Sequence, residues 1–215
     1  GYSNPSLEKI IDLKPDLILA TFGNPGKLID QLKKFDLPVV GLNPKTIEEI
    51  FGSIELVGKI TDKEEKALEL VENLRGRTEK VLAKTEKLTQ EQRPRVLYVV
   101  WYKPLWTAGS GTFIDELIQK AGGINIAGDV SGWPKMSLEA VIEKNPEIII
   151  VGEGHPGGLI ETVKAESTLS ETDAFKNNKI FTIDADIVSR TGPRIIDALE
   201  EMAKIIHPEL FKVSD

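Results

Sequence analysis

Side chains that could carry catalysis are scarce in this chain of 215 residues. It has no cysteine and only two histidines, His155 and His207. It contains no Walker phosphate loop, no G-x-S-x-G nucleophile elbow and no H-E-x-x-H zinc motif. His207 stands at the predicted end of the last helix, where the helix dipole favours a cation, and we expect a structural role there. We therefore predict no catalytic residue, no metal site and no enzymatic activity.

His155 is the histidine for which ligand binding stays open. It lies in the glycine-rich stretch 152–158, directly after an apolar segment. Ligands of open α/β sheets bind at the carboxyl ends of the strands. A metal or haem contact by His155 fits that position, but an ordinary exposed loop histidine is the preferred interpretation.

Aromatic residues indicate binding rather than catalysis. Only 6% of residues are aromatic, yet all three tryptophans, Trp101, Trp106 and Trp133, stand beside turn residues within one stretch of the chain. Each tryptophan could simply cover an edge of the core. Gathered in loops at strand ends, they would instead form a flat, rigid wall for a planar ligand.

A polar pair follows the last predicted strand. Asp186 and Arg190 stand between an apolar strand and the final helix, so we expect them on a loop at the ligand-facing edge of a sheet. A surface ion pair of little consequence is the simpler interpretation. The functional alternative is an anchor for the rim of a ligand, because a guanidinium suits carboxylate, amide or phosphate oxygens.

Two similar segments predict the elements that position these residues. Residues 6–19 and 137–150 both begin with Ser-Leu-Glu, continue with Leu, Ile or Val at helical spacing, and reach a proline, an acid and an apolar run. The serine is a helix N-cap, the proline ends the helix, and the unbroken apolar run is typical of a buried parallel strand. The repetition predicts two related α/β lobes with mostly parallel sheets. Further elements alternate, with strands over 38–41, 95–101 and 179–183 and helices over 27–34, 47–58, 112–121 and 192–206.

A long helical segment separates the two copies. Over residues 61–92, leucine and valine recur at roughly helical spacing among Glu and Lys. At about 1.5 Å per residue, such a helix would run for over ~40 Å, enough to cross from one lobe to the other. We predict a first lobe over 1–60, a connecting helix over 61–92 and a second lobe over 93–215. The first lobe is short, and we expect it to be truncated at its N-terminus.

Composition excludes two kinds of partner. A formal net charge of -7, with Lys and Arg spread among acids, does not suit nucleic acid, which needs a concentrated basic face. The longest apolar runs have the length of strands and are far too short to span a membrane. The lack of cysteine fits an extracytoplasmic protein, although it fits many cytosolic ones as well.

The ordered set of motifs resembles a known family along essentially the whole chain. Besides the repeated segment, it comprises Trp106-Thr-Ala-Gly109, Ala121-Gly-Gly-Ile-Asn-Ile126, Trp133-Pro134, Asn145-Pro-Glu147 and Gly192-Pro-Arg-Ile195. This set is similar to the periplasmic-binding fold with a rigid connecting helix, the group of vitamin B12-, ferric siderophore- and haem-binding proteins of ABC importers. The resemblance implies two lobes, a shallow cleft and a metal chelate as ligand, a corrinoid such as vitamin B12 (cobalamin) first and a ferric siderophore next, with no intrinsic cofactor. The substrate-binding residues that it implies are Phe22, Trp101, Trp106, Trp133, Asp186 and Arg190.

The resemblance also implies a membrane partner. Glu139 matches the second-lobe glutamate that docks on arginines of the ABC permease. The first-lobe counterpart falls near Gly26 and Lys27, so that salt bridge is missing or moved. The expected location is extracytoplasmic, in the periplasm or at the cell surface, with a lipid anchor as one form of attachment.

Two other classes of protein stay open. One is a haem- or other metal-cofactor-binding protein of the same fold. The other is a cofactor-carrier or enzyme domain of nitrogenase-like architecture, which would need cysteine ligands that this chain lacks.

Overall fold

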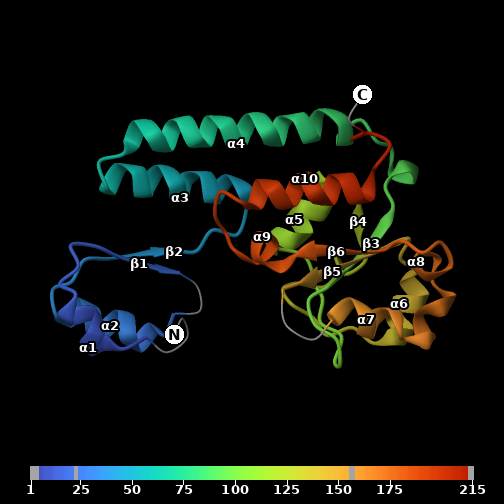
Figure 1. Ribbon diagram of the computed structural model, residues 1–215, viewed down its shortest axis with the longest axis horizontal. Coiled ribbons are helices and arrows are strands. Elements are labelled where there is room, and N and C mark those ends of the chain that lie inside the picture. Colours follow the sequence, from blue (N-terminus) through green and yellow to red (C-terminus); the bar gives the residue numbers. More distant parts are fainter. Residues whose placement is uncertain (1–4, 22–23, 155–157, 213–215) are drawn as a thin grey trace. The chain divides into compact units, whose positions relative to one another are not determined.

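The computed structural model describes residues 5–21, 24–154 and 158–212, and the chain divides into two compact units, 1–44 and 45–215 (Figure 1). Each unit contains a sheet with helices, and every strand pair in the described ranges is parallel. The α/β class with parallel sheets is therefore confirmed.

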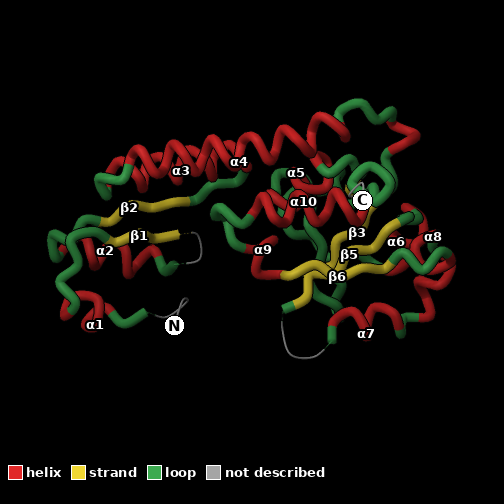
Figure 2. The backbone as a smooth tube through the Cα atoms, turned by 45° about the horizontal axis from the view of Figure 1, so that its top comes forward, coloured by secondary structure: helices red, strands yellow, loops and turns green. Residues whose placement is uncertain are grey.

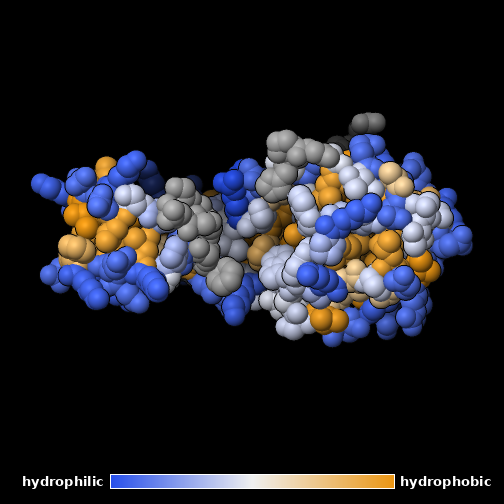
Figure 3. Space-filling model, turned by 90° about the horizontal axis from the view of Figure 1, so that it is seen from below, coloured by the Kyte–Doolittle hydropathy of each residue, from blue (hydrophilic) through white to orange (hydrophobic). Residues whose placement is uncertain are grey.

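In the first unit, two helices alternate with two strands along the chain. Its elements are α1 (Leu7–Asp12), β1 (Ile18–Thr21), α2 (Gly26–Lys34) and β2 (Val39–Leu42). Ser6 caps α1 as predicted, because its hydroxyl accepts a hydrogen bond from the Lys9 N–H at 3.3 Å. Leu28 and Leu32 of α2 are buried. The side of the unit that carries α1 and α2 shows an apolar area (Figure 3).

The second unit is built on a four-stranded sheet of order β4-β3-β5-β6 (Figure 2). Its strands are β3 (Arg95–Val99), β4 (Ile124–Asn125), β5 (Ile148–Glu153) and β6 (Ile180–Asp184). One side of the sheet is covered by α5 (Phe113–Lys120), α9 (Ala185–Ser189) and α10 (Ile195–Ile206). Helix α4 (Glu64–Thr85) packs on α10 and α5, and α3 (Ile47–Ile60) packs against α4. On the other side lie α6 (Leu138–Lys144), α7 (Leu159–Lys164) and α8 (Asp173–Lys176). Short 3₁₀ turns occupy Gln90–Gln92 and Ser167–Glu171.

Strand β3 explains why its sequence is an unbroken apolar run. Val96 and Tyr98 face the core under α5 and α10, whereas Leu97 and Val99 face a second core on the opposite side. Because successive side chains of a strand point to opposite faces, a sheet covered on both sides needs apolar residues at every position.

The long helical run is realised as α4, which continues through Gly76 without a break. The guanidinium of Arg77 joins it to α10, with bonds of 2.6 Å to Asp197 and of 2.7 and 2.9 Å to Glu200. The predicted role of this segment as a connection between lobes stays a prediction. The expectation for the last helix is wrong in one detail, because α10 begins at Ile195 with Arg194 as N-cap, and Pro193 precedes its first turn.

The close crossing of α3 and α4 yields a stability prediction. A Cβ atom on Gly58 would lie only 2.3 Å from the Cβ of Ala67, whereas a Cβ on Gly76 meets no atom within 4 Å. We expect Gly58→Ala to lower the free energy of unfolding by about 1–3 kcal/mol through overpacking. The matched change Gly76→Ala should raise it by roughly 0.5–1 kcal/mol, because it replaces a glycine inside a helix. Urea denaturation followed by circular dichroism measures both, and a Gly58→Ala variant at least as stable as the parent would contradict the packing argument.

Candidate functional site

Two loops at the carboxyl ends of β3 and β4 are hydrogen-bonded to each other. We call residues 100–111 and 127–136 the paired loops. The Gly109 N–H donates to the carbonyl oxygen of Gly132 at 2.7 Å, and the Gly132 N–H donates to that of Ser110 at 3.0 Å. The Thr107 N–H donates to the Pro134 oxygen at 3.1 Å. These bonds join two segments from different parts of the sequence into one surface at the edge of the sheet where α/β proteins bind ligands.

Gly109 allows the closest approach between the paired loops. A Cβ atom at this position would lie 1.9 Å from the carbonyl oxygen of Val130, a distance that real atoms cannot adopt. The Trp106–Gly109 motif therefore ends in glycine because any side chain at this position would collide with the facing loop.

A buried polar network around Asn125 connects the paired loops to β4 and α5. The Asn125 amide nitrogen donates to the Ala108 carbonyl and to Asp115 Oδ1, both at 2.8 Å, and the Asn125 oxygen accepts from the Ala127 N–H at 3.1 Å. Asn125 and Asp115 are 8% and 6% exposed. Sequence reasoning did not single out these two residues, although a lone asparagine between Ile124 and Ile126 was a usable signal, since buried polar groups need partners.

All three tryptophans lie on the paired loops, which hydrogen bonds and short bridges join to each other. Trp101 and Trp133 are 50% and 44% exposed. Trp106 is partly buried, and the Lys135 ammonium lies 5.0 Å from its ring centroid. A cation at that distance covers one face of the indole. The paired loops therefore present Trp101 and Trp133 to solvent more openly than Trp106.

Phe113 supports Trp133 and was missed from the sequence. The two rings meet edge to face, with 6.0 Å between centroids and 66° between their planes. Phe113 is the first residue of α5 and also packs against the larger hydrophobic core. Trp133 is thus connected through one aromatic contact to the interior of the second unit.

Tyr102 anchors the first of the paired loops between two charged groups. Its ring is buried, and the Lys103 ammonium lies 5.8 Å from the ring centroid. Burial raises the pKa of the Tyr102 phenol well above its usual range, and the nearby Glu166 carboxylate raises it further. The phenol therefore keeps its proton to a higher pH than an exposed tyrosine does.

The predicted polar pair follows β6 as expected, but it does not lie on a loop. Asp186 belongs to the short helix α9, Arg190 is its C-cap, and Asp184 caps the helix by accepting from the Asp186 N–H at 2.7 Å. Arg190 Nη2 lies 2.8 Å from Asp186 Oδ1, one helical turn apart, and the two side chains are 64% and 56% exposed. The pair is thus an exposed intrahelical ion pair in this structure.

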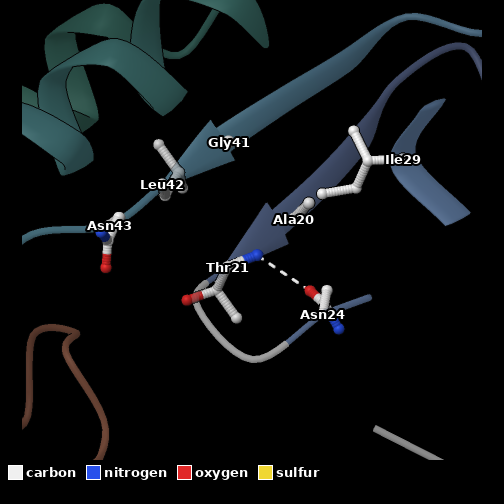
Figure 4. A pocket seen from close by; sticks show the side chains of 7 residues that line it. All are labelled: Ala20, Thr21, Asn24, Ile29, Gly41, Leu42 and Asn43. Atoms are coloured by element: carbon white, nitrogen blue, oxygen red, sulfur yellow. Dashed lines mark hydrogen bonds between the residues drawn. The ribbon is translucent and has the colours of Figure 1, made fainter. Parts of the chain in front are cut away.

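A hollow opens at the carboxyl ends of β1 and β2 in the first unit (Figure 4). Its volume is about 540 Å³, and its described lining consists of Ala20, Thr21, Asn24, Ile29, Gly41, Leu42 and Asn43. The Thr21 N–H donates to Asn24 Oδ1 at 2.9 Å across one side of it. Thr21, Leu42 and Asn43 stand at or directly after the ends of apolar strand segments, which is the signal that could have identified them. The predicted contact Phe22 lies outside the described residues, as does His155.

The described residues hold no group of three or more His, Cys, Asp or Glu side chains that could bind a metal ion. Within the same ranges, no helix has the length and apolarity to cross a membrane. His207 is buried, with Nε2 3.1 Å from the Gly122 oxygen and Nδ1 3.1 Å from Glu209 Oε1, in keeping with the expected structural role.

Comparisons with known proteins agree on one family. The family described as "Periplasmic binding protein" matches residues 1–187. An uncharacterized ABC transporter substrate-binding lipoprotein of Bacillus subtilis, YvrC, is 32% identical over 99% of this chain and 68% of its own length. The vitamin B12-binding protein of Vibrio parahaemolyticus is 27% identical over 95% of this chain and 73% of its own length. A possible iron-binding, periplasmic solute-binding protein of Staphylococcus epidermidis superposes with a TM-score of 0.83 at 33% identity, covering 96% of this chain and 81% of that one.

Proposed function

Because this chain belongs to the periplasmic binding protein family, we propose that it captures a metal chelate, a corrinoid such as vitamin B12 first and a ferric siderophore second, and delivers it to the permease of an ABC importer. The chain is the extracytoplasmic substrate-binding component of an ABC transporter. Members of the family bind solutes for transport and are not enzymes.

The observation that carries the chelate proposal is the exposure of Trp101 and Trp133 on the paired loops. Two large indole rings that remain half exposed on a hydrogen-bonded surface offer flat contact area at little cost in side-chain entropy. A metal chelate with a wide, flat face matches such a surface. The relatives that carry vitamin B12-binding and iron-binding names support the same class of ligand.

Asp186 and Arg190 supply the polar part of the proposed site. Both side chains are more than half exposed and bind each other, so either one can turn to a ligand at small cost. We propose that they hold the polar rim of the chelate, with Trp106 beside the aromatic contacts, and Phe22 stays a contact predicted from the sequence.

Titration with chelates tests the proposal directly. Cyanocobalamin, a ferric hydroxamate and haemin are added separately while tryptophan emission is recorded, and all three tryptophans lie in the second unit. We expect saturable quenching by at least one corrinoid or ferric chelate. Quenching by haemin alone would favour the haem-binding alternative, and no quenching by any of them would remove the chelate proposal.

Permease docking gives a separate prediction at Glu139. This residue is exposed in the first turn of α6, where the Ser137 hydroxyl caps the helix. We propose that it pairs with a basic residue of the permease, and the net charge of -7 suits a basic partner. Glu139→Arg should lower chelate uptake in reconstituted vesicles by about tenfold or more, since charge reversal at an interface opposes association. Chelate affinity should not change, and Glu143→Arg, exposed on the same helix, should transport normally. Uptake by Glu139→Arg at the level of the parent would place docking elsewhere.

A further inference from the structure

The Lys135 ammonium, on the second of the paired loops, has no acidic partner in the described ranges. Its side chain is exposed, and the ammonium lies 5.0 Å from the centroid of the Trp106 ring. The carboxylate of the same loop, Asp129, is already paired with Lys144 at 2.7 Å. The contact that the positive charge of Lys135 makes is therefore with the electron-rich face of an indole.

Backbone pairing holds Lys135 directly opposite Trp106, because the two residues form an antiparallel bridge. Hydrogen bonds flank the bridge on both sides, from the Thr107 N–H to the Pro134 oxygen at 3.1 Å and from the Met136 N–H to the Leu105 oxygen at 3.0 Å. Trp133 and Lys135 stand two positions apart and are both exposed, whereas the residue between them is partly buried. Since side chains alternate along an extended segment, the ammonium shares its exposed face with the Trp133 indole.

We propose that Lys135 sets the charge preference of this surface, and that it selects chelates that carry an anionic oxygen (phosphate, carboxylate or phenolate) beside a flat face. The inference rests on the proposed capture of a chelate and adds the charge class of the ligand. An exposed ammonium gains little from an indole, whereas a charge-assisted hydrogen bond to an anionic oxygen is strong, so the ligand oxygen can replace the ring as its partner. The same movement uncovers the face of Trp106 that Lys135 occupies in the free protein.

The charge of the whole chain makes a local cation decisive for an anionic ligand. A formal net charge of -7 repels anions, so an anionic chelate needs a positive group at the point of contact. The Arg190 guanidinium can supply one only by giving up its bond of 2.8 Å to Asp186. Lys135 offers its charge without the loss of an ion pair.

Removing the charge of Lys135 tests the proposal with two pairs of probes. An anionic ferric triscatecholate is compared with an uncharged ferric trihydroxamate, and cyanocobalamin is compared with dicyanocobinamide, which lacks the nucleotide phosphate. Isothermal titration calorimetry should show that Lys135→Met lowers the affinity for the anionic or phosphate-bearing member of a pair by about tenfold, because a charge-assisted hydrogen bond is lost. The affinity for the other member should stay within about twofold. The pair that responds tells a phenolate from a phosphate.

Lys179→Met is the matched control, because Lys179 is an exposed lysine that directly precedes β6, at the amino edge of the sheet, opposite the paired loops. It changes the net charge equally and should bind all probes as the parent does, and Lys135→Arg should keep the preference of the parent. Added salt should weaken binding of the anionic probe by the parent more than by Lys135→Met.

Equal losses for both members of each pair, no loss for any probe, or binding of the uncharged or phosphate-free probes alone by the parent would overturn the role of Lys135 while leaving chelate capture intact. Failure of the parent to bind any of the four probes would instead overturn the proposed function and this inference together.

Discussion

Gly109→Ala is expected to lower the free energy of unfolding by about 3 kcal/mol, the upper range for a point substitution that forces packed groups apart. The added Cβ would lie 1.9 Å from the Val130 carbonyl oxygen, and that oxygen belongs to the backbone and accepts the Ser110 N–H at 2.8 Å. A flexible side chain could move aside, but here the paired loops must separate. Thermal and urea denaturation measure the loss of stability.

The control for Gly109→Ala is Ser110→Ala on the next residue. Ser110 is partly exposed, and the substitution keeps its backbone bonds, so stability should change by no more than about 0.5 kcal/mol. Chelate binding should fall in Gly109→Ala even below its unfolding temperature, because the loops that hold the tryptophans are displaced. Gly109→Ala with parental stability and affinity would show that the loops can shift freely.

Trp133→Ala is expected to weaken chelate binding by about 30- to 100-fold, which corresponds to roughly 2–3 kcal/mol and is typical of a buried aromatic contact in an interface. The indole is 44% exposed in the free protein, and its edge-to-face contact with Phe113 holds the ring in place. Trp133→Phe should retain part of the affinity, since it keeps an aromatic face. Isothermal titration calorimetry measures the affinity of each variant.

Val130→Ala is the matched control for Trp133→Ala. Val130 lies on the same loop and its side chain is also 44% exposed, so the substitution removes apolar surface at similar exposure without removing an aromatic ring. Its affinity should stay within about threefold of the parent, the usual effect of a peripheral contact. A Trp133→Ala variant that binds as well as Val130→Ala would remove Trp133 from the site.

The fold was predictable where local chemistry and burial lead to the same structure. Ser6 and Ser137 both cap their helices as expected. Each hydroxyl accepts a hydrogen bond from the N–H three residues later, that of Lys9 and that of Ala140. The unbroken apolar run of β5 required helices on both faces of its sheet, and the structure has them. Both predictions depend only on residues that are neighbours in the sequence, so a local pattern is enough to make them.

The site was predictable only as far as the residue types indicated it. The clustering of three tryptophans was visible, but the approach of Gly109 to Val130 and the ring contact of Phe113 with Trp133 join segments that are distant in sequence. Such pairings depend on register between loops, for which no local pattern exists. A loop was expected at Asp186, but this segment forms a helix. The Asp184 carboxylate caps it by accepting a hydrogen bond from the Asp186 N–H, which has no partner within the helix.

The last helix closes the interior of the second unit. Helix α10 packs against α4, α5, α9 and β6, and it contributes fully buried side chains at Ile195, Ile196, Leu199 and Met202. These partners precede it in the chain, in the case of Arg77 by about 120 residues. Contacts so remote in sequence cost more loop-closure entropy than local contacts, because a long stretch of chain must be ordered before they form. Removing or shortening α10 would therefore uncover the largest apolar core of this unit, so the folding of its earlier elements depends on a segment far from them in the sequence.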